Sequence, residues 1–130
     1  MRPLPDAFFR NRETEPLRRA AMRCLERALG AVDPGAAIRR AVQVDGTRLT
    51  VAGETSDLRE YLGVFVVGGG KAAAAMAAAL EGVLGDRLEG GVVSVKYGHA
   101  VPTARVEVRE AGHPFPDAAS VAAADAVLDL

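Results

Sequence analysis

The sequence predicts an α/β fold, in which a Rossmann-like parallel sheet carries flanking helices. Residues 64–67 and 90–95 contain short, continuous apolar runs rich in valine. Such runs are typical of strands that are buried on both faces of a parallel sheet. Between them, the alanine-rich residues 72–84 predict a helix, which residues Gly82 and Gly85 bring to an end. The order strand, helix, strand indicates a right-handed βαβ unit with parallel neighbouring strands.

We divide the chain into residues 1–62, a helical arm with an edge strand, and residues 63–130, a glycine-turn core of βαβ-β-α order. Residues 1–13 are expected to form a loosely held arm that two phenylalanines anchor to the body. Thr14 is expected to cap a first helix, in which apolar residues recur at helical spacing toward Gly30. The arginine-rich opposite face of this helix is interpreted as a solvated face.

A second helix is expected to begin with Asp33 as its N-cap and Pro34 in its first turn. Residues 44–47 then form a turn into a short alternating strand, residues 48–51, which we expect at the edge of a sheet. Residues 56–61 are expected to be a helical turn or loop that leads into the strand at residues 64–67.

Composition excludes several classes of function. The chain has 130 residues, 49% of them hydrophobic, and a formal net charge of −1, so it has no basic field for nucleic acid. No apolar run approaches the length that spans a membrane, and the N-terminus shows no signal peptide, so a cytoplasmic location is expected. Cys24 is the single cysteine, which excludes an internal disulfide and a cysteine-based metal cluster. We interpret it as a core residue.

The stretch with the strongest functional signal is Gly68-Gly69-Gly70-Lys71, between the strand at residues 64–67 and the alanine-rich helix. Glycines allow a tight turn and a close approach of a ligand to the backbone. The unsatisfied amides at a helix start attract an anion, and Lys71 adds a compact positive charge. Lys71 and Lys96 are the only lysines among sixteen basic residues, and each lies beside a glycine-bearing turn. The stretch therefore predicts a phosphate site, with a glycine turn kept only for close packing as the alternative.

Two known phosphate motifs fit this stretch unequally. A P-loop would need glycine at Phe65 and a serine or threonine at Ala72, so the stretch is not a Walker A loop. Gly68, Gly70 and Ala73 do satisfy the dinucleotide pattern G-x-G-x-x-A. In that pattern a carboxylate at the end of the next strand holds the ribose, whereas here that strand ends in Lys96.

Further candidate residues follow the later strands. Lys96, His99 and His113 are expected just beyond strand ends, where open α/β sheets bind ligands. Each histidine could bind an anionic substrate or move a proton, or could be a loop histidine bonded to the backbone. Residues 106–108 are expected to be a third strand, and Asp117 is expected to cap a helix over residues 118–130. Ser94 and Ser120 lack the glycine elbow that exposes a nucleophile, and two histidines without a nearby cysteine do not resemble a zinc site.

Three segments together resemble the class II glycerate 2-kinase family, whose members have sometimes been named hydroxypyruvate reductases. They are Val67-Gly68-Gly69-Gly70-Lys71-Ala72 with the helix that follows, residues 91–99, and residues 110–117 (EAGHPFPD). The first helix and the strand around Leu49 also resemble that family, so the resemblance covers nearly the whole chain.

The resemblance implies transfer of a phosphoryl group from ATP, with Mg²⁺, to the 2-hydroxyl of D-glycerate, giving 2-phosphoglycerate. It implies that Lys71 is the catalytic lysine that neutralises the transferring phosphoryl group, assisted by the Gly68, Gly69 and Gly70 amides. Lys96, His99 and His113 would lie near substrate. The family is much longer and two-domained, with a second glycine-rich turn and a catalytic arginine beyond this length. We therefore expect this chain to be an incomplete first domain that is inactive alone.

Two other hypotheses remain open. An NAD(P)H-dependent hydroxypyruvate reductase is motivated by Gly68, Gly70 and Ala73, with Lys96 favouring a 2′-phosphate. The third is a non-catalytic folding or homo-oligomerising unit whose apolar faces are covered by a partner chain.

Overall fold

The computed structural model describes residues 15–130, and the predictions for the arm at residues 1–13 and for Thr14 lie outside these residues. The chain divides into two compact units, Met1–Asp33 and Pro34–Leu130. In the first unit, the predicted helix is confirmed as α1 (Glu15–Ala31). The expectation that Cys24 is a core residue is wrong, because its side chain is exposed. None of the residues of α1 is buried.

The second unit begins with α2 (Pro34–Ala41), at the predicted position. A small antiparallel sheet follows, in the order β1-β2-β3, with strands β1 (Val42–Asp45), β2 (Arg48–Val51) and β3 (Glu54–Asp57). The predicted strand β2 is confirmed, but it is the middle strand of this sheet and not an edge. Ser56 and Asp57 lie in β3, so the expected loop there is wrong, and the helical turn η2 (Leu58–Glu60) starts only after them. The residues of β3 are polar and show no apolar alternation, so the sequence does not indicate a strand; main-chain pairing to β2 holds it.

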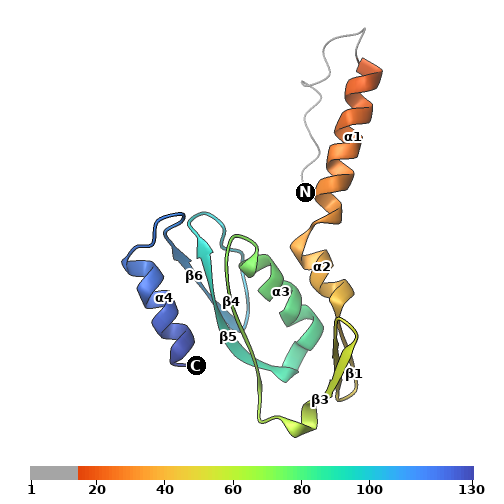
Figure 1. The fold of residues 1–130 in the computed structure, drawn as a ribbon. Helices are drawn as coiled ribbons and strands as arrows, with labels where there is room; N and C mark the ends of the chain where they lie inside the picture. Colours follow the sequence, from red (N-terminus) through yellow and green to blue (C-terminus); the bar gives the residue numbers. More distant parts are fainter. Residues whose placement is uncertain (1–14) are drawn as a thin grey trace. The chain divides into compact units, whose positions relative to one another are not determined.

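The predicted α/β fold with a parallel sheet and flanking helices is confirmed in the rest of this unit (Figure 1). The sheet has the order β4-β5-β6, and both pairs of strands are parallel. The helix after β4 returns the chain so that β5 runs in the same direction. The elements are β4 (Val64–Gly69), α3 (Ala73–Leu84), the turn η3 (Gly85–Arg87), β5 (Leu88–Lys96), β6 (Val106–Ala111) and α4 (Ala118–Leu128).

Helix α3 covers one face of this sheet. Its alanines Ala73, Ala74 and Ala77 are buried in the core against Val93 and Val106 of the strands. Small side chains on a helix allow it to approach a sheet closely, which explains why an alanine-rich helix follows β4. Glycine does the same between strands: at Gly91 of β5, a β-carbon would collide with the backbone of Val66 in β4.

Helix α4 covers the opposite face, as Figure 1 shows. Alternate residues of a strand face opposite sides, and Arg109 of β6 donates a hydrogen bond of 3.0 Å to the main-chain oxygen of Ala122 in α4. Helix α4 packs on β5 and β6. The expectation that the first strand is buried on both faces is therefore wrong. Phe65 and Val67 of β4 are 52% and 56% exposed, because β4 is the edge strand and no helix of the described chain covers them.

The parallel register brings the carboxyl ends of the three strands to one edge of the sheet, since Gly69 pairs with Ser94 and Lys96 pairs with Ala111. Gly68 and Gly69 belong to β4 itself, so the predicted turn of three glycines is corrected: of the three, Gly70 alone lies in the turn.

Within the described residues, no helix is long and apolar enough to cross a membrane.

Candidate functional site

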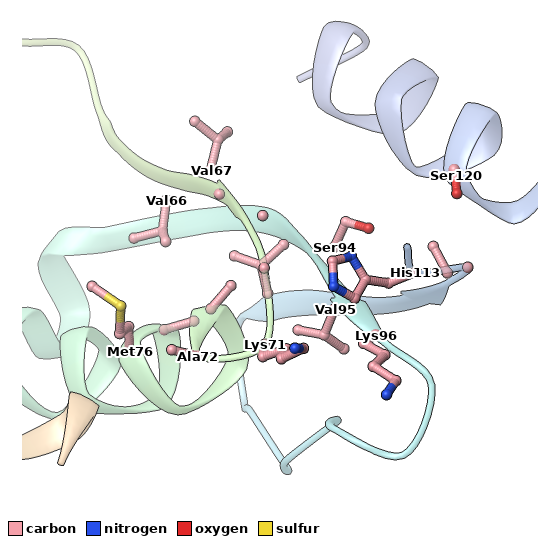
Figure 2. A pocket seen from close by; sticks show the side chains of 18 of the residues that line it. Val66, Val67, Lys71, Ala72, Met76, Ser94, Val95, Lys96, His113 and Ser120 are labelled. Carbon is pink, nitrogen blue, oxygen red and sulfur yellow. The ribbon is translucent and has the colours of Figure 1, made fainter. Parts of the chain in front are cut away.

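A cavity of about 660 Å³ lies at the carboxyl ends of β4, β5 and β6. Figure 2 shows its lining side chains, which come from the end of β4, the start of α3, the end of β5, the segment after β6 and the first turn of α4. The carboxyl edge of a parallel sheet is where α/β proteins bind their ligands. The polar and glycine residues of this lining are Gly68, Gly69, Gly70, Lys71, Ser94, Lys96, Gly112, His113 and Ser120.

In the glycine stretch, Gly70 leaves open space beside the cavity, but its amide is not a free hydrogen-bond donor. The amide of Gly70 donates to the main-chain oxygen of Ser94 at 2.9 Å, and the amide of Ala73 donates to the oxygen of Gly70 at 3.0 Å. Gly70 has a φ of +119°, which favours glycine, and a β-carbon there would meet nothing within 4 Å. In the described chain, the Lys71 and Ala72 amides have no main-chain acceptor. These two amides are therefore available to an anion, whereas the amide of Gly70 is not.

The two lysines of the chain both line the cavity. Lys71 is exposed in the turn between β4 and α3, and Lys96 is the half-buried last residue of β5. Neither lysine forms an ion pair with a carboxylate of residues 15–130. The cavity therefore carries two uncompensated positive charges beside free amides, an arrangement that suits a phosphate or carboxylate ligand.

The two histidines differ in position. His113 lines the cavity on the segment between β6 and α4. His99 does not belong to the lining, and its amide donates to the main-chain oxygen of Lys96 at 3.0 Å in the turn after β5. The structure therefore brings His113 together with Lys71 and Lys96, and leaves His99 outside the cavity.

Asp117 fixes the segment that carries His113, and its predicted role as a helix cap is confirmed. Its carboxylate accepts hydrogen bonds from the Tyr97 hydroxyl at 2.8 Å, the Gly112 amide at 3.2 Å and the Ser120 amide at 3.0 Å. These donors, with the Tyr97 hydroxyl first, lower the pKa of Asp117 to about 2. One carboxylate thus ties the turn after β5 to the segment after β6 and to the start of α4.

Some lining residues were not singled out from the sequence as ligand contacts. Ser94 and Ser120 lack the glycine elbow of a nucleophile, yet both line the cavity. Ser94 lies two residues before Lys96, on the same face of β5, and this spacing was the available signal. Tyr97 was missed because its partner, Asp117, lies twenty residues further along the chain.

The residues around the cavity do not fit a magnesium site. Magnesium is usually held by one or two carboxylates together with substrate phosphates. The lining contains no carboxylate, and the described residues contain no group of three potential metal ligands. Asp117 lies nearby, but main-chain and tyrosine donors already occupy it. The lining of this cavity therefore offers a magnesium ion no carboxylate ligand.

Comparison with known proteins gives one matching family. The model described as "Domain of unknown function (DUF4147)" matches residues 20–130. A curated relative, the glycerate 2-kinase of Pyrococcus horikoshii, is 36% identical over 114 residues, which are 88% of this chain and 25% of the relative. This chain thus spans about a quarter of the length of that relative.

Solved structures agree with this match. A protein from Pyrococcus horikoshii aligns with a TM-score of 0.72 at 37% sequence identity, over 84% of this chain and 24% of that protein. A glycerate kinase from Thermotoga maritima aligns with a TM-score of 0.65 at 31% identity, over 88% of this chain and 25% of the kinase. The resemblance to glycerate 2-kinases is therefore confirmed over nearly all of this chain.

Proposed function

This chain belongs to the DUF4147 family, and we propose that it forms the N-terminal part of an ATP-dependent kinase that phosphorylates the 2-hydroxyl of D-glycerate, giving 2-phosphoglycerate. The observation that carries the proposal is the cavity at the carboxyl edge of the sheet. Lys71 and Lys96 line it, and the main-chain amides of Lys71 and Ala72 have no main-chain acceptor. Relatives that are named glycerate kinase support the choice of substrate.

Phosphoryl transfer asks a protein mainly for positioning and charge stabilisation. ATP supplies the phosphoryl group: the substrate hydroxyl oxygen forms a bond to the γ-phosphorus while the bond to the ADP oxygen breaks. Lys71, with the amides of Lys71 and Ala72, stabilises the negative charge on the transferring group. Lys96 orients a second anionic group, which is a phosphate or the carboxylate of glycerate. His113, the histidine of the lining, accepts the proton that the hydroxyl releases.

The proposal is tested with a family-length polypeptide that carries residues 1–130, by measuring ADP formation that depends on D-glycerate. Replacing Lys71 with alanine is expected to lower kcat about 100-fold or more, the usual cost of losing one charge-stabilising donor. Arg87→Ala is the matched control, because it removes one positive charge from the turn η3, outside the cavity lining. Full activity in the Lys71→Ala variant would contradict the role of this lysine.

The reductase hypothesis makes a different prediction for the same cavity. Gly68, Gly70 and Ala73 fit a dinucleotide pattern, and Lys96 stands where a ribose-binding carboxylate is expected. Titration calorimetry of the chain with NADPH and with ATP distinguishes the two functions. Binding of ATP but not of NADPH supports the kinase, whereas binding of NADPH that Lys96→Ala abolishes supports the reductase.

A further inference from the structure

Two carboxylates near the end of β6 hold the turn that follows β5. Glu110 of β6 accepts a hydrogen bond from the amide of Gly98 at 2.6 Å. Asp117, at the start of α4, accepts one from the Tyr97 hydroxyl at 2.8 Å. Both donors directly follow Lys96, the last residue of β5. The two acids, which we call the clamp carboxylates, therefore hold the chain immediately after a lysine of the cavity.

The Asp117 carboxylate also closes the short segment that carries His113. It accepts a hydrogen bond from the Gly112 amide at 3.2 Å, so the residues on both sides of the histidine are joined. The closed segment leaves no room for a side chain at Gly112, where a β-carbon would lie 2.5 Å from the main-chain oxygen of Phe115. One carboxylate thus holds both the segment of His113 and the residue after Lys96. Figure 2 shows these two side chains at the cavity.

The partners of the clamp carboxylates indicate that they hold the chain and do not neutralise the cavity. Within residues 15–130, neither acid forms an ion pair with Lys96 or His113. Their donors are hydroxyl groups and main-chain amides of the surrounding loops. Hydrogen bonds to an ionised acceptor are about twice as strong as those between neutral groups. The clamp carboxylates therefore order these loops and leave the Lys96 ammonium group available for an anionic ligand.

We propose that Glu110 and Asp117 are positioning residues of the proposed kinase, which place Lys96 and His113 for the bound D-glycerate. Each acid acts through the chain that it holds and not through contact with the substrate. The inference deepens the proposed function and rests on it for the identity of the substrate. Lys71 lies in the turn after β4, to which neither acid is hydrogen-bonded. The clamp carboxylates therefore serve the part of the cavity that holds D-glycerate and not the part that holds ATP.

The test compares two substitutions of Glu110 in the family-length polypeptide. Glu110→Ala removes the acceptor of the Gly98 amide, whereas Glu110→Gln keeps an acceptor in the same place. We expect Glu110→Ala to raise the KM for D-glycerate and to lower kcat, each about tenfold, because a small misplacement of binding groups is costly. We expect the KM for ATP to change less than about twofold, and Glu110→Gln to recover most of the loss. A fall in kcat with both KM values unchanged, or equal losses in both variants, overturns the proposal.

Tyr97→Phe tests the second acid, since it removes the donor to Asp117 and keeps the cap of α4. We expect the same rise in the KM for D-glycerate, with the KM for ATP unchanged; equal changes in both KM values overturn the role of Asp117. Glu107→Ala is the matched control, because it removes an exposed acid of β6 whose partner, Arg109, lies outside the cavity lining. It is expected to leave all three constants unchanged, and circular dichroism verifies that every variant is folded.

Failure of the proposed function gives a separate result. If the unchanged polypeptide forms no ADP that depends on D-glycerate, the proposed kinase is wrong, and positioning is then measured with inorganic phosphate. The 130-residue chain is titrated while the ring resonances of His113 are followed by nuclear magnetic resonance. Phosphate binding that is about tenfold weaker in Glu110→Ala, and restored in Glu110→Gln, supports positioning of an anion. Equal affinities in all three chains, or ring resonances that phosphate does not shift, overturn it.

Discussion

The amide of Gly70 donates a hydrogen bond to the main-chain oxygen of Ser94 across 2.9 Å, and this bond extends the pairing of β4 with β5 by one residue. The bond uses the donor that a glycine turn would otherwise offer to a phosphate. It also holds the start of the next turn against β5, and the two amides that follow, those of Lys71 and Ala72, have no main-chain acceptor in the described chain. Gly70 therefore shapes the turn, and its amide is already bonded to β5.

Replacing Gly70 with alanine is expected to destabilise the chain by about 1–3 kcal/mol, the cost of holding a residue with a side chain at an unfavourable φ. The φ of +119° is the cause, since no neighbouring atom blocks a β-carbon. Gly82→Ala is the control: Gly82 lies inside α3 with open space around it, and alanine there is expected to stabilise the chain by about 0.5–1 kcal/mol. Urea unfolding measures both changes, and the same sign for both would contradict this account of Gly70.

Glu81 makes the stability of the sheet depend on pH. Its carboxylate accepts hydrogen bonds from the amides of Ala104, Arg105 and Val106, at 2.7–3.1 Å, and so joins α3 to the start of β6. Burial raises the pKa of Glu81, but these donors outweigh it and leave the pKa below its usual 4.5. Because the unfolded chain then binds the proton more readily, the stabilisation is complete above about pH 4.5 and is lost as the pH falls through the folded pKa.

The measurement is the free energy of unfolding between pH 3 and pH 7 for the unchanged chain and for Glu81→Gln. We expect the variant to be less stable by about 1 kcal/mol at neutral pH, and the difference to shrink as the pH falls. Glu89→Gln removes the same charge from an exposed residue of β5 and serves as the control. A difference between the unchanged chain and Glu81→Gln that stays constant with pH would show that the ionised carboxylate is not what stabilises this contact.

Tyr97 reports on the carboxylate that fixes the cavity segment. Its hydroxyl donates to Asp117, and this hydrogen bond, with burial and the negative charge, raises the pKa of Tyr97 above 10.0. In a Tyr61→Phe background, Tyr97 is the remaining tyrosine and its ionisation is followed by ultraviolet absorbance. We expect Asp117→Asn to lower the pKa of Tyr97 toward 10.0. An unchanged titration curve would mean that the two side chains do not interact in solution.

The core of the fold could be predicted from the sequence because its signals are local. The valine runs of β4 and β5 and the alanines of α3 specify a βαβ unit, and Asp117 specifies the start of α4. The exposure of Phe65 and Val67 could not be predicted, because a strand at a sheet edge has the same composition as a central one. Strand β3 was missed since its polar residues show no apolar alternation.

Part of the candidate site could also be predicted from the sequence, because the order of the strands places its residues. Strand ends on one edge of a parallel sheet meet, so Lys71, Lys96 and His113 could be placed together from their order alone. His99 does not line the cavity. It follows the turn after β5, in which its amide donates to the main-chain oxygen of Lys96. The donors of the site also differ from expectation, because Gly68 and Gly69 continue β4 instead of turning.

The proposed function requires that an anion binds between the Lys71 ammonium group and the amides of Lys71 and Ala72. It is tested most directly by titrating the ¹⁵N-labelled chain with ATP and following the backbone amide resonances. We expect the largest saturable shifts at Lys71 and Ala72, with binding weakened at least about tenfold in Lys71→Ala and unchanged in Arg87→Ala. Shifts that miss these two amides, or that persist unaltered in Lys71→Ala, would contradict the account.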